Sequence, residues 1–215
     1  MDQHLFFLIN RTWARPSLDL LMATASSWDF WWPVLVVGAV WALAAGGFRA
    51  RAMVAAAVIA VGITDAVVVD SIKGVVGRPR PNAVLEGARS IDLAKARPRF
   101  LALSKPLKVE WTPAGRHPKR GNSFPSGHAA NNFAVATVVF LFYRRYGWLA
   151  FLPAALVSYS RIYVGSHWPS DVLVSCALGS LLAVLVVYGL RWAWRKFGGR
   201  WLPGIHGNHP DLLET

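Results

Sequence analysis

The sequence predicts an all-α protein: a polytopic bundle of membrane helices with interfacial helices before it and a long basic loop. Of the 215 residues, 54% are hydrophobic and only 16% are charged, whereas soluble domains have about 25% charged residues. Uncharged runs long enough to cross ~30 Å of hydrocarbon recur along the chain. The net charge of +12 is concentrated in one segment. At this length we expect one membrane-embedded domain over residues 1–215.

Five apolar segments are predicted to span the membrane. Trp31–Phe48 and Val172–Leu190 contain 18 and 19 residues without a charge, enough to cross a bilayer as helices. One of the other three carries Asp65 and Asp70, and two are runs of 15 residues that need flanking polar residues to reach the required length. The five predicted spans are residues 31–48, 52–72, 129–143, 146–160 and 172–190.

The first thirty residues contain two weaker apolar pieces, Leu5–Ile9 and Leu18–Ala25, separated by Arg11, Arg15 and Pro16. We interpret them as interfacial helices, and the alternative is a sixth, broken span. Aromatic residues follow at positions 28, 30, 31 and 32. Such rings favour the boundary between membrane and water, so we expect this cluster to mark it.

The segment Lys73–Arg120 differs in kind from the rest of the chain. It holds five lysines and seven arginines against three acids, a net charge of +9. Prolines interrupt it, and its one predicted helix lies around Leu93–Leu103. Loops of this length inside a compact fold are usually functional or disordered. We expect residues 73–125 to form a loop on the active-site side.

Three polar clusters interrupt the apolar pattern: KGVVGRPRP at 73–81, FPSGHAANN at 124–132 and SRIYVGSHWPSD at 160–171. A zigzag of five spans brings all three to one face of the membrane. Charged groups that border a span are costly and mark functional sites by default. Together the clusters supply three cations, two imidazoles and one carboxylate, which are Lys73, Arg80, Arg161, His128, His167 and Asp171.

These groups suit phosphoryl transfer without a metal. Cations can neutralise the equatorial oxygens that carry charge in the transition state, while one histidine attacks phosphorus and the other protonates the departing oxygen. Ser126 stands where a helix should begin. We expect its hydroxyl to cap that helix, and the N–H groups near Gly127 and His128 to bind an anion. Asp171, four residues after His167, should accept a hydrogen bond from that ring.

The same residues resemble the three signature motifs of the type 2 phosphatidic acid phosphatase superfamily. The motifs are Lys73 with Arg80-Pro81 after six residues, Pro125-Ser126-Gly127-His128, and Ser160-Arg161 followed by His167 and Asp171. The six-residue spacing selects Arg80 rather than Arg78 from the RPRP repeat. The resemblance implies a metal-independent phosphatase that works through a phosphohistidine and needs no cofactor.

On that pattern His167 is the nucleophile, Asp171 its orienting partner and His128 the general acid. The residues that would bind the phosphate are Lys73, Arg80, Ser126, Gly127 and Arg161. Soluble vanadium haloperoxidases share the motifs, but the predicted spans favour the branch of membrane lipid phosphatases.

The short loops and the tail carry cations on the face opposite the motifs. They are Arg49, Arg51, Arg144, Arg145, Arg191, Arg195 and Lys196. Cations in short loops favour the cytoplasmic side, so we expect an integral protein of a bacterial inner membrane whose site faces the periplasm. The positive 73–120 loop argues against this orientation. We expect the substrate and acidic head groups to balance its charge, and a cytoplasmic site is the alternative.

A site at the membrane boundary suits an anionic lipid phosphate whose tail stays in the bilayer. Nucleic acid is not expected as a partner, because the basic residues lie at membrane ends. LINRTWARPSLDLLM at residues 8–22 is similar to bacterial members that act on undecaprenyl diphosphate, which we favour. Phosphatidylglycerophosphate, phosphatidic acid and lipid A phosphates are its rivals.

Two other functions are weighed against a phosphatase. A lipid phosphotransferase would use the same phosphohistidine and pass the phosphoryl group to another lipid. A non-catalytic lipid transporter would explain the helices and the loop but has no need of two histidines and Asp171 together. Structural roles are expected for Asp65, Asn131 and Asn132 as hydrogen-bonding groups between helices, and for Cys176 in packing.

Overall fold

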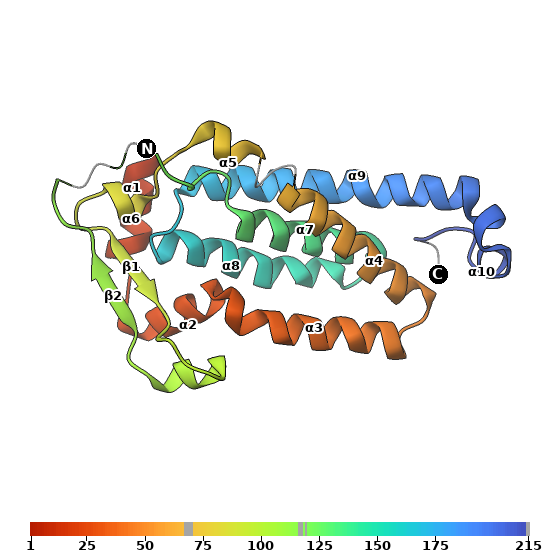
Figure 1. The fold of residues 1–215 in the computed structure, drawn as a ribbon, viewed down its shortest axis with the longest axis horizontal. Helices are drawn as coiled ribbons and strands as arrows, with labels where there is room; N and C mark the ends of the chain where they lie inside the picture. Colours follow the sequence, from red (N-terminus) through yellow and green to blue (C-terminus); the bar gives the residue numbers. More distant parts are fainter. Residues whose placement is uncertain (67–70, 116–117, 119, 214–215) are drawn as a thin grey trace.

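The computed structural model describes residues 1–66, 71–115, 118 and 120–213. Five helices run along the long axis of an elongated bundle (Figure 1). They are α3 (Trp28–Ala45), α4 (Phe48–Ile63), α7 (Gly127–Phe142), α8 (Phe151–Tyr163) and α9 (Pro169–Trp201). α7 contacts α4, α8 and α9, so it is the central helix of the bundle.

Helices occupy all five segments that were predicted to span the membrane. α3 and α9 are long and apolar enough to cross a bilayer, and α7 is a shorter apolar helix. A third candidate span begins at Phe48 and extends past Ile63, where α4 ends. α8 has 13 residues. Part of the second predicted span, residues 67–70, lies outside the described residues. Three helices are therefore candidate spans by length and composition, and the total of five stays a prediction.

Small residues let the central helices approach closely at the end that carries the polar clusters. A Cβ atom on Gly179 of α9 would lie 2.0 Å from the carbonyl oxygen of Ala130 in α7. Further along the same interface, Ala134 and Ala183 are fully buried in one core cluster. Close backbone approach through small side chains is typical of packed membrane helices. It fixes the start of α7 against the start of α9.

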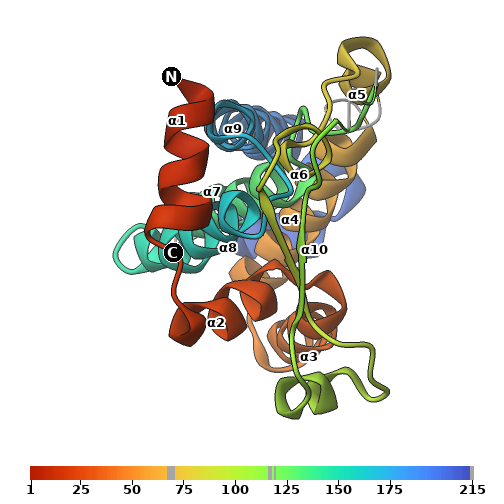
Figure 2. The same ribbon diagram turned by 90° about the vertical axis from the view of Figure 1, so that its left-hand side faces the viewer.

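The two amino-terminal apolar pieces are helical, as predicted. α1 (Asp2–Phe7) continues into the π-helix η1 (Leu8–Thr12), and α2 (Pro16–Ser26) follows. α1 lies beside the first turns of α9 (Figure 2), where the ring of Phe6 lies 6.0 Å from that of Trp168. The location of these helices at the membrane interface, and the alternative of a sixth span, are predictions.

The 73–125 segment contains more structure than the sequence predicted. It forms α5 (Ser71–Val76), α6 (Pro81–Val84), strand β1 (Arg89–Asp92), the 3₁₀ helix η3 (Arg99–Ser104) and strand β2 (Lys108–Trp111). The strands pair in antiparallel fashion with Arg89 opposite Trp111. The expectation of an all-α fold was therefore wrong for this hairpin, and the helix placed around Leu93–Leu103 is the shorter η3.

Long-range contacts explain why sequence periodicity missed the hairpin. Strands of four residues are too short to show a convincing alternation. β1 is held instead by other parts of the chain. The guanidinium of Arg89 lies 2.6 Å from the carboxylate of Asp19, and the Asn10 side chain hydrogen-bonds both the N–H and the carbonyl of Arg89. The amino-terminal helices thus form the support on which the loop folds.

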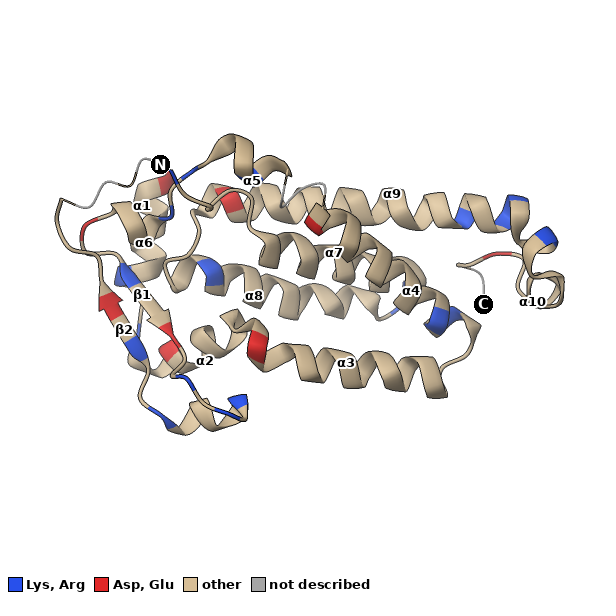
Figure 3. Cartoon of the chain, viewed as in Figure 1, with Lys and Arg blue, Asp and Glu red and all other residues tan. Residues whose placement is uncertain are grey.

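The two ends of the bundle carry different features. α7 and α9 begin, and α8 ends, at the end next to α1 and the hairpin, whereas the α3–α4 turn and the end of α9 lie at the other (Figure 1). The predicted convergence of the three polar clusters is thereby confirmed. Cations also gather at the opposite end, near the end of α9 and the start of α4 (Figure 3). There the short helices η4 (Gly147–Ala150) and α10 (Pro203–Asn208) complete the fold.

Candidate active site

The predicted site residues come from four helices and from the segments that precede α6, α7 and α9, and they meet at one end of the bundle. Lys73, Arg80 and Arg161 are the cations whose charges act on the ring of His128, at the start of α7. The charges of Arg161, Arg80 and His128 also reach the ring of His167, in the loop before α9. The structure therefore gathers three cations around two imidazoles, although they are up to 94 positions apart in the sequence.

His167 is held in one tautomer by a backbone carbonyl. Its side chain is buried, with 3% of the residue exposed, and Nδ1 lies 2.6 Å from the carbonyl oxygen of Ser123. Because a carbonyl only accepts hydrogen bonds, Nδ1 carries the proton and Nε2 keeps its lone pair. Burial and the charge of Arg161 lower the pKa of His167 well below its ordinary value, against the opposing effect of the bond to Ser123. The ring is thus a neutral imidazole with a free nucleophilic nitrogen.

The loop that carries His167 depends on a glycine. Gly165 has a φ of +84°, a conformation that favours glycine because it has no Cβ. A Cβ at this position would lie 2.2 Å from the carbonyl oxygen of Arg89 in β1. The hairpin therefore packs directly against the turn that presents the histidine.

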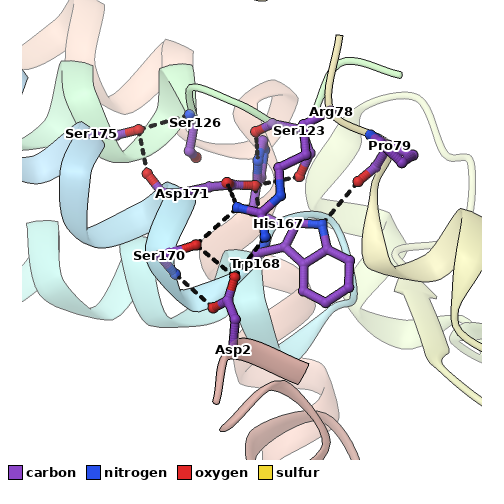
Figure 4. Close-up of polar contacts among 10 residues, drawn as sticks. All are labelled: Asp2, Arg78, Pro79, Ser123, Ser126, His167, Trp168, Ser170, Asp171 and Ser175. Carbon is purple, nitrogen blue, oxygen red and sulfur yellow. Dashed lines mark hydrogen bonds and ion pairs between the residues drawn. The ribbon is translucent and has the colours of Figure 1, made fainter. Parts of the chain in front are cut away.

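No hydrogen bond joins Asp171 to His167, which corrects the expected pairing. Its Oδ2 accepts hydrogen bonds from the Ser123 hydroxyl at 2.5 Å and from the Trp168 N–H at 3.3 Å, and its Oδ1 accepts one from Arg78 at 2.5 Å (Figure 4). α9 begins at Pro169, so His167 precedes the helix, and the four-residue spacing does not place the two side chains on one face. Asp171 sits in the first turn and folds back over the helix start. Its link to the imidazole runs through Ser123.

Ser126 precedes α7 as predicted, but its hydroxyl does not cap the helix. Its N–H donates to the hydroxyl of Ser175 at 2.8 Å, and that hydroxyl donates to the carbonyl of Asp171 at 2.6 Å. The first helical hydrogen bond is from the Ala130 N–H to the Ser126 carbonyl, so the amides of Gly127 and His128 lie ahead of the ladder. Amides at a helix start form an anion site.

Two buried polar atoms at this site have no hydrogen-bond partner within the described part of the chain. They are the Ser126 hydroxyl and Nε of Arg161. Arg161 is fixed at its other end, because Nη1 donates to the carbonyl oxygen of Ser26 at 3.0 Å and also contacts the Ser26 hydroxyl. Buried polar groups are nearly always paired in proteins. An anionic ligand with several acceptor oxygens would satisfy both.

Arg78 forms ion pairs with two carboxylates of the protein. Arg80, two residues later, is the arginine that was predicted to bind the phosphate. One guanidinium nitrogen of Arg78 donates to Asp171 and to Ser170, and the other donates to Asp2 at 2.7 Å. The guanidinium also lies 4.9 Å from the centre of the Trp168 ring. Both terminal nitrogens of Arg78 therefore donate within the protein, and the choice of Arg80 for the phosphate stays a prediction.

Sequence reasoning missed several residues that shape the site. Ser123 lies three positions before Ser126, and Arg78 lies in the RPRP repeat, so both were near enough to a motif to be found. Asp2 and Ser26 gave no signal, because only the folded chain brings them to the site. Among the described residues, no group of three or more His, Cys, Asp or Glu side chains could hold a metal ion.

The geometry agrees with a comparison against known protein families. The model of the PAP2 superfamily matches residues 50–195, a range that includes every predicted site residue. The chain belongs to the PAP2 superfamily. This confirms the resemblance seen in the three motifs.

Curated relatives match the chain over shorter segments. An undecaprenyl-diphosphatase of Sulfolobus acidocaldarius is 46% identical over 66 residues, which cover 30% of this chain and 32% of the relative. A lipid A 1-phosphatase of Porphyromonas gingivalis is 43% identical over 71 residues, covering 30% of this chain and 15% of the relative. The matched segment is thus about a third or less of each relative's length.

A solved structure matches most of the chain. The crystal structure of Aquifex aeolicus LpxE aligns with a TM-score of 0.62 and 26% sequence identity, covering 87% of this chain and 94% of that one. The fold of this solved structure therefore extends over most of the chain.

Proposed function

We propose that this PAP2 protein is an integral membrane lipid phosphatase that hydrolyses the phosphomonoester or diphosphate head group of an anionic lipid. The observation that carries the proposal is the state of His167. Its Nδ1 proton is held by the Ser123 carbonyl, so Nε2 is the free nitrogen, among the charges of Arg161 and Arg80. A nucleophile in the right tautomer next to cations suits attack on a phosphate.

In the first step, Nε2 of His167 attacks phosphorus and the bond from phosphorus to the leaving oxygen breaks. His128 donates a proton to that oxygen, so the lipid leaves as an alcohol or as a monophosphate. The phosphorylated ring keeps its Nδ1 proton and becomes positive, which strengthens its hydrogen bond to the Ser123 carbonyl. Lys73, Arg80 and Arg161 neutralise the charge of the transferring group.

In the second step, water attacks the phosphorus of the phosphohistidine. His128, now neutral, takes a proton from this water, the P–N bond breaks, and inorganic phosphate leaves. The buried Ser126 hydroxyl and the amides of Gly127 and His128 would hold the phosphate oxygens in both steps. Asp171 takes part through Ser123 rather than by contact with the ring. No step needs a metal ion.

Undecaprenyl diphosphate is the substrate we favour. The support is the amino-terminal pattern at residues 8–22, the excess of cations in the 73–120 loop, and a relative named as an undecaprenyl-diphosphatase. Lipid A phosphates are the second candidate, supported by a relative named as a lipid A 1-phosphatase. The cations at the opposite end of the bundle support a bacterial inner-membrane location with the site on the periplasmic side.

Phosphate release by purified protein tests the proposal. In detergent and excess chelator, the protein should release inorganic phosphate from undecaprenyl diphosphate faster than from lipid A, phosphatidylglycerophosphate or phosphatidic acid. His206→Ala, a histidine variant at the opposite end, should keep this activity. Transfer of the phosphoryl group to a second lipid without free phosphate would instead indicate a phosphotransferase. If the protein hydrolyses none of these lipid phosphates, the non-catalytic lipid transporter becomes the favoured function.

A further inference from the structure

We propose that Asp2, on the first helix, is a positioning residue of the active site that acts on His167 through Arg78. The inference deepens the proposed function and rests on it. Asp2 accepts hydrogen bonds from the Ser170 N–H at 3.0 Å, the Ser170 hydroxyl at 2.6 Å and the Arg78 guanidinium at 2.7 Å. The carboxylate thus joins the start of α9 to the arginine (Figure 4).

From Arg78 the chain of contacts continues to the proposed nucleophile. The guanidinium binds Oδ1 of Asp171 at 2.5 Å, and Oδ2 of Asp171 accepts from the Ser123 hydroxyl at 2.5 Å. The carbonyl of Ser123 then binds Nδ1 of His167 at 2.6 Å. Each contact fixes the position of the next group. A change in the orientation of Arg78 would therefore change the position of the His167 imidazole.

Two features make Asp2 suited to this task. First, its position is set by packing, because Phe6 on the same helix is fully buried and contacts Trp168, whose ring lies under the guanidinium of Arg78. Second, it is ionised. Burial raises the pKa of Asp2, but the hydrogen bonds from Ser170 and Arg78 outweigh this and lower it below the ordinary value. A carboxylate is also favoured at the positive amino-terminal end of a long helix such as α9.

The test compares Asp2→Asn with Asp211→Asn, which removes an arginine partner at the opposite end of the bundle. Asp2→Asn should lower kcat about tenfold and leave KM within about twofold, because binding groups are untouched while the nucleophile is misaligned. Asp2→Glu should recover part of the loss, and Asp211→Asn should keep wild-type kcat. Unchanged kcat in Asp2→Asn, or equal losses in the two Asn variants, would overturn the inference.

A double-mutant cycle separates a positioning role from general damage. Asp2 and Ser123 share no contact, so independent effects on activity should multiply. If both act through Arg78 and Asp171, the double variant Asp2→Asn with Ser123→Ala should lose about as much kcat as the worse single variant. A fully multiplicative loss would refute the relay. Absence of phosphatase activity in the wild type would refute the proposed function instead, which keeps the two failures distinct.

A second surface carries an independent inference, which goes beyond the proposed function. Residues 94–108, which we term the basic hook, contain five cations and lie within a stretch, 93–109, that has no acid. The hook includes η3, where Phe100, Leu101 and Leu103 are 61%, 44% and 40% exposed. Exposed apolar side chains flanked by cations are typical of segments that lie in a membrane interface.

The position of the basic hook indicates that its partner is the membrane interface. η3 contacts α3 and lies at the level where that helix begins (Figure 1), next to the aromatic residues expected at the membrane boundary. We infer that the hook inserts Phe100 and Leu101 into the interface, while Lys95, Arg97 and Lys105 bind anionic lipid head groups. This accounts for cations that the phosphate site does not use.

Spin labels test the hook without relying on activity. In a Cys176→Ala background, which removes the one native cysteine, a label at Phe100→Cys should be accessible to oxygen and shielded from a water-soluble nickel reagent in phosphatidylglycerol nanodiscs. The control label at Ala114→Cys, an exposed site beyond the hairpin, should show the reverse. Replacing the three cations by Gln should expose the label at position 100. Equal nickel accessibility at positions 100 and 114, or no effect of the Gln substitutions, would overturn the inference.

Discussion

Arginine–carboxylate clusters lie at both ends of this bundle, and they differ in what they touch. At one end, Arg78 joins Asp2 to Asp171, whose side chain is fully buried, and the contacts continue to His167. At the other, Arg191 holds Asp211 through contacts of 2.6 to 2.9 Å, and the pair fastens the carboxyl-terminal segment to α9. The same type of ion pair is linked by hydrogen bonds to the proposed nucleophile in the first case, and joins the carboxyl-terminal segment to α9 in the second.

The comparison also shows how the site is built from remote support. Ser26 holds Arg161, Asp2 holds Arg78, and Asn10 holds the hairpin. All three supports come from the amino-terminal helices, which contain none of the three motifs. The motif residues therefore depend on a part of the chain that the motifs do not reveal.

Among the cations of the two ends, a large contrast in activity is expected between Arg161→Gln and Arg191→Gln. Arg161→Gln removes a cation from the phosphate site and should lower kcat/KM by about 10²–10³ fold, because charge on the transferring phosphoryl group is no longer neutralised. Arg191→Gln should stay within about threefold of wild type. Steady-state phosphate release measures both. Equal losses of kcat/KM in the two variants would contradict the assignment of the active site to one end of the bundle and of a structural role to the other.

A smaller effect is expected for Ser126→Ala. The buried hydroxyl has no partner within the described chain, so its removal should leave stability nearly unchanged but lower affinity for the phosphate about tenfold or more, as for a lost hydrogen bond to a charged group. The inhibition constant of inorganic phosphate, alongside the melting temperature, checks this. Ser104→Ala, on the exposed hook, is the control that should change neither.

The pH dependence of kcat/KM should reflect the pKa of His167. Burial and the charge of Arg161 lower its pKa, and attack requires the neutral ring. The fall of kcat/KM on the acid side should therefore lie below pH 6.5, near which an ordinary histidine titrates. A monoester and a diphosphate substrate should give the same midpoint if the group belongs to the enzyme. A midpoint above pH 6.5 with both would contradict the assignment.

The smallest effect concerns Asp211→Asn, which should cost about 1 kcal/mol of stability and no activity. Hydrogen bonds from Arg191 lower the pKa of Asp211. A depressed carboxylate pKa stabilises the fold above the unfolded value, about 3.9, and the contribution is lost as the pH falls through the lower folded value. Melting curves of wild type and variant should therefore differ at pH 7 and converge below about pH 4.

Much of the fold could be predicted, because length and lack of charge define a membrane helix directly. Helices occupy all five predicted segments, and the expected pairing of Asp65 with another helix is confirmed by the hydrogen bond from Asn131 at 2.9 Å. Asn132 was expected to pair between helices too, but it binds the carbonyl of His128 in its own helix. The hairpin was missed because remote contacts, rather than its own pattern, stabilise it.

The sequence predicted which polar residues come together at one end of the bundle, but not the contacts that they make. The motifs identified His167, Asp171 and Ser126, and the structure places them together. The prediction that Asp171 pairs with His167 was wrong, because the partners of Asp171 depend on where α9 starts, at Pro169. The Ser126 hydroxyl was expected to cap α7 but makes no capping hydrogen bond, and the Ser126 N–H donates to Ser175. Such details follow from backbone geometry at helix ends, which spacing along the sequence does not determine.

The most direct test of the account is to trap the covalent intermediate. Rapid acid-free quenching of the enzyme with ³²P-labelled lipid substrate, in excess chelator, should give an acid-labile and alkali-stable phosphoenzyme, and peptide mapping should place the label on His167. His167→Ala should form none and should lose at least about a thousandfold in kcat, whereas His206→Ala should label normally. Full phosphate release by His167→Ala, or a strict requirement for magnesium, would contradict the mechanism.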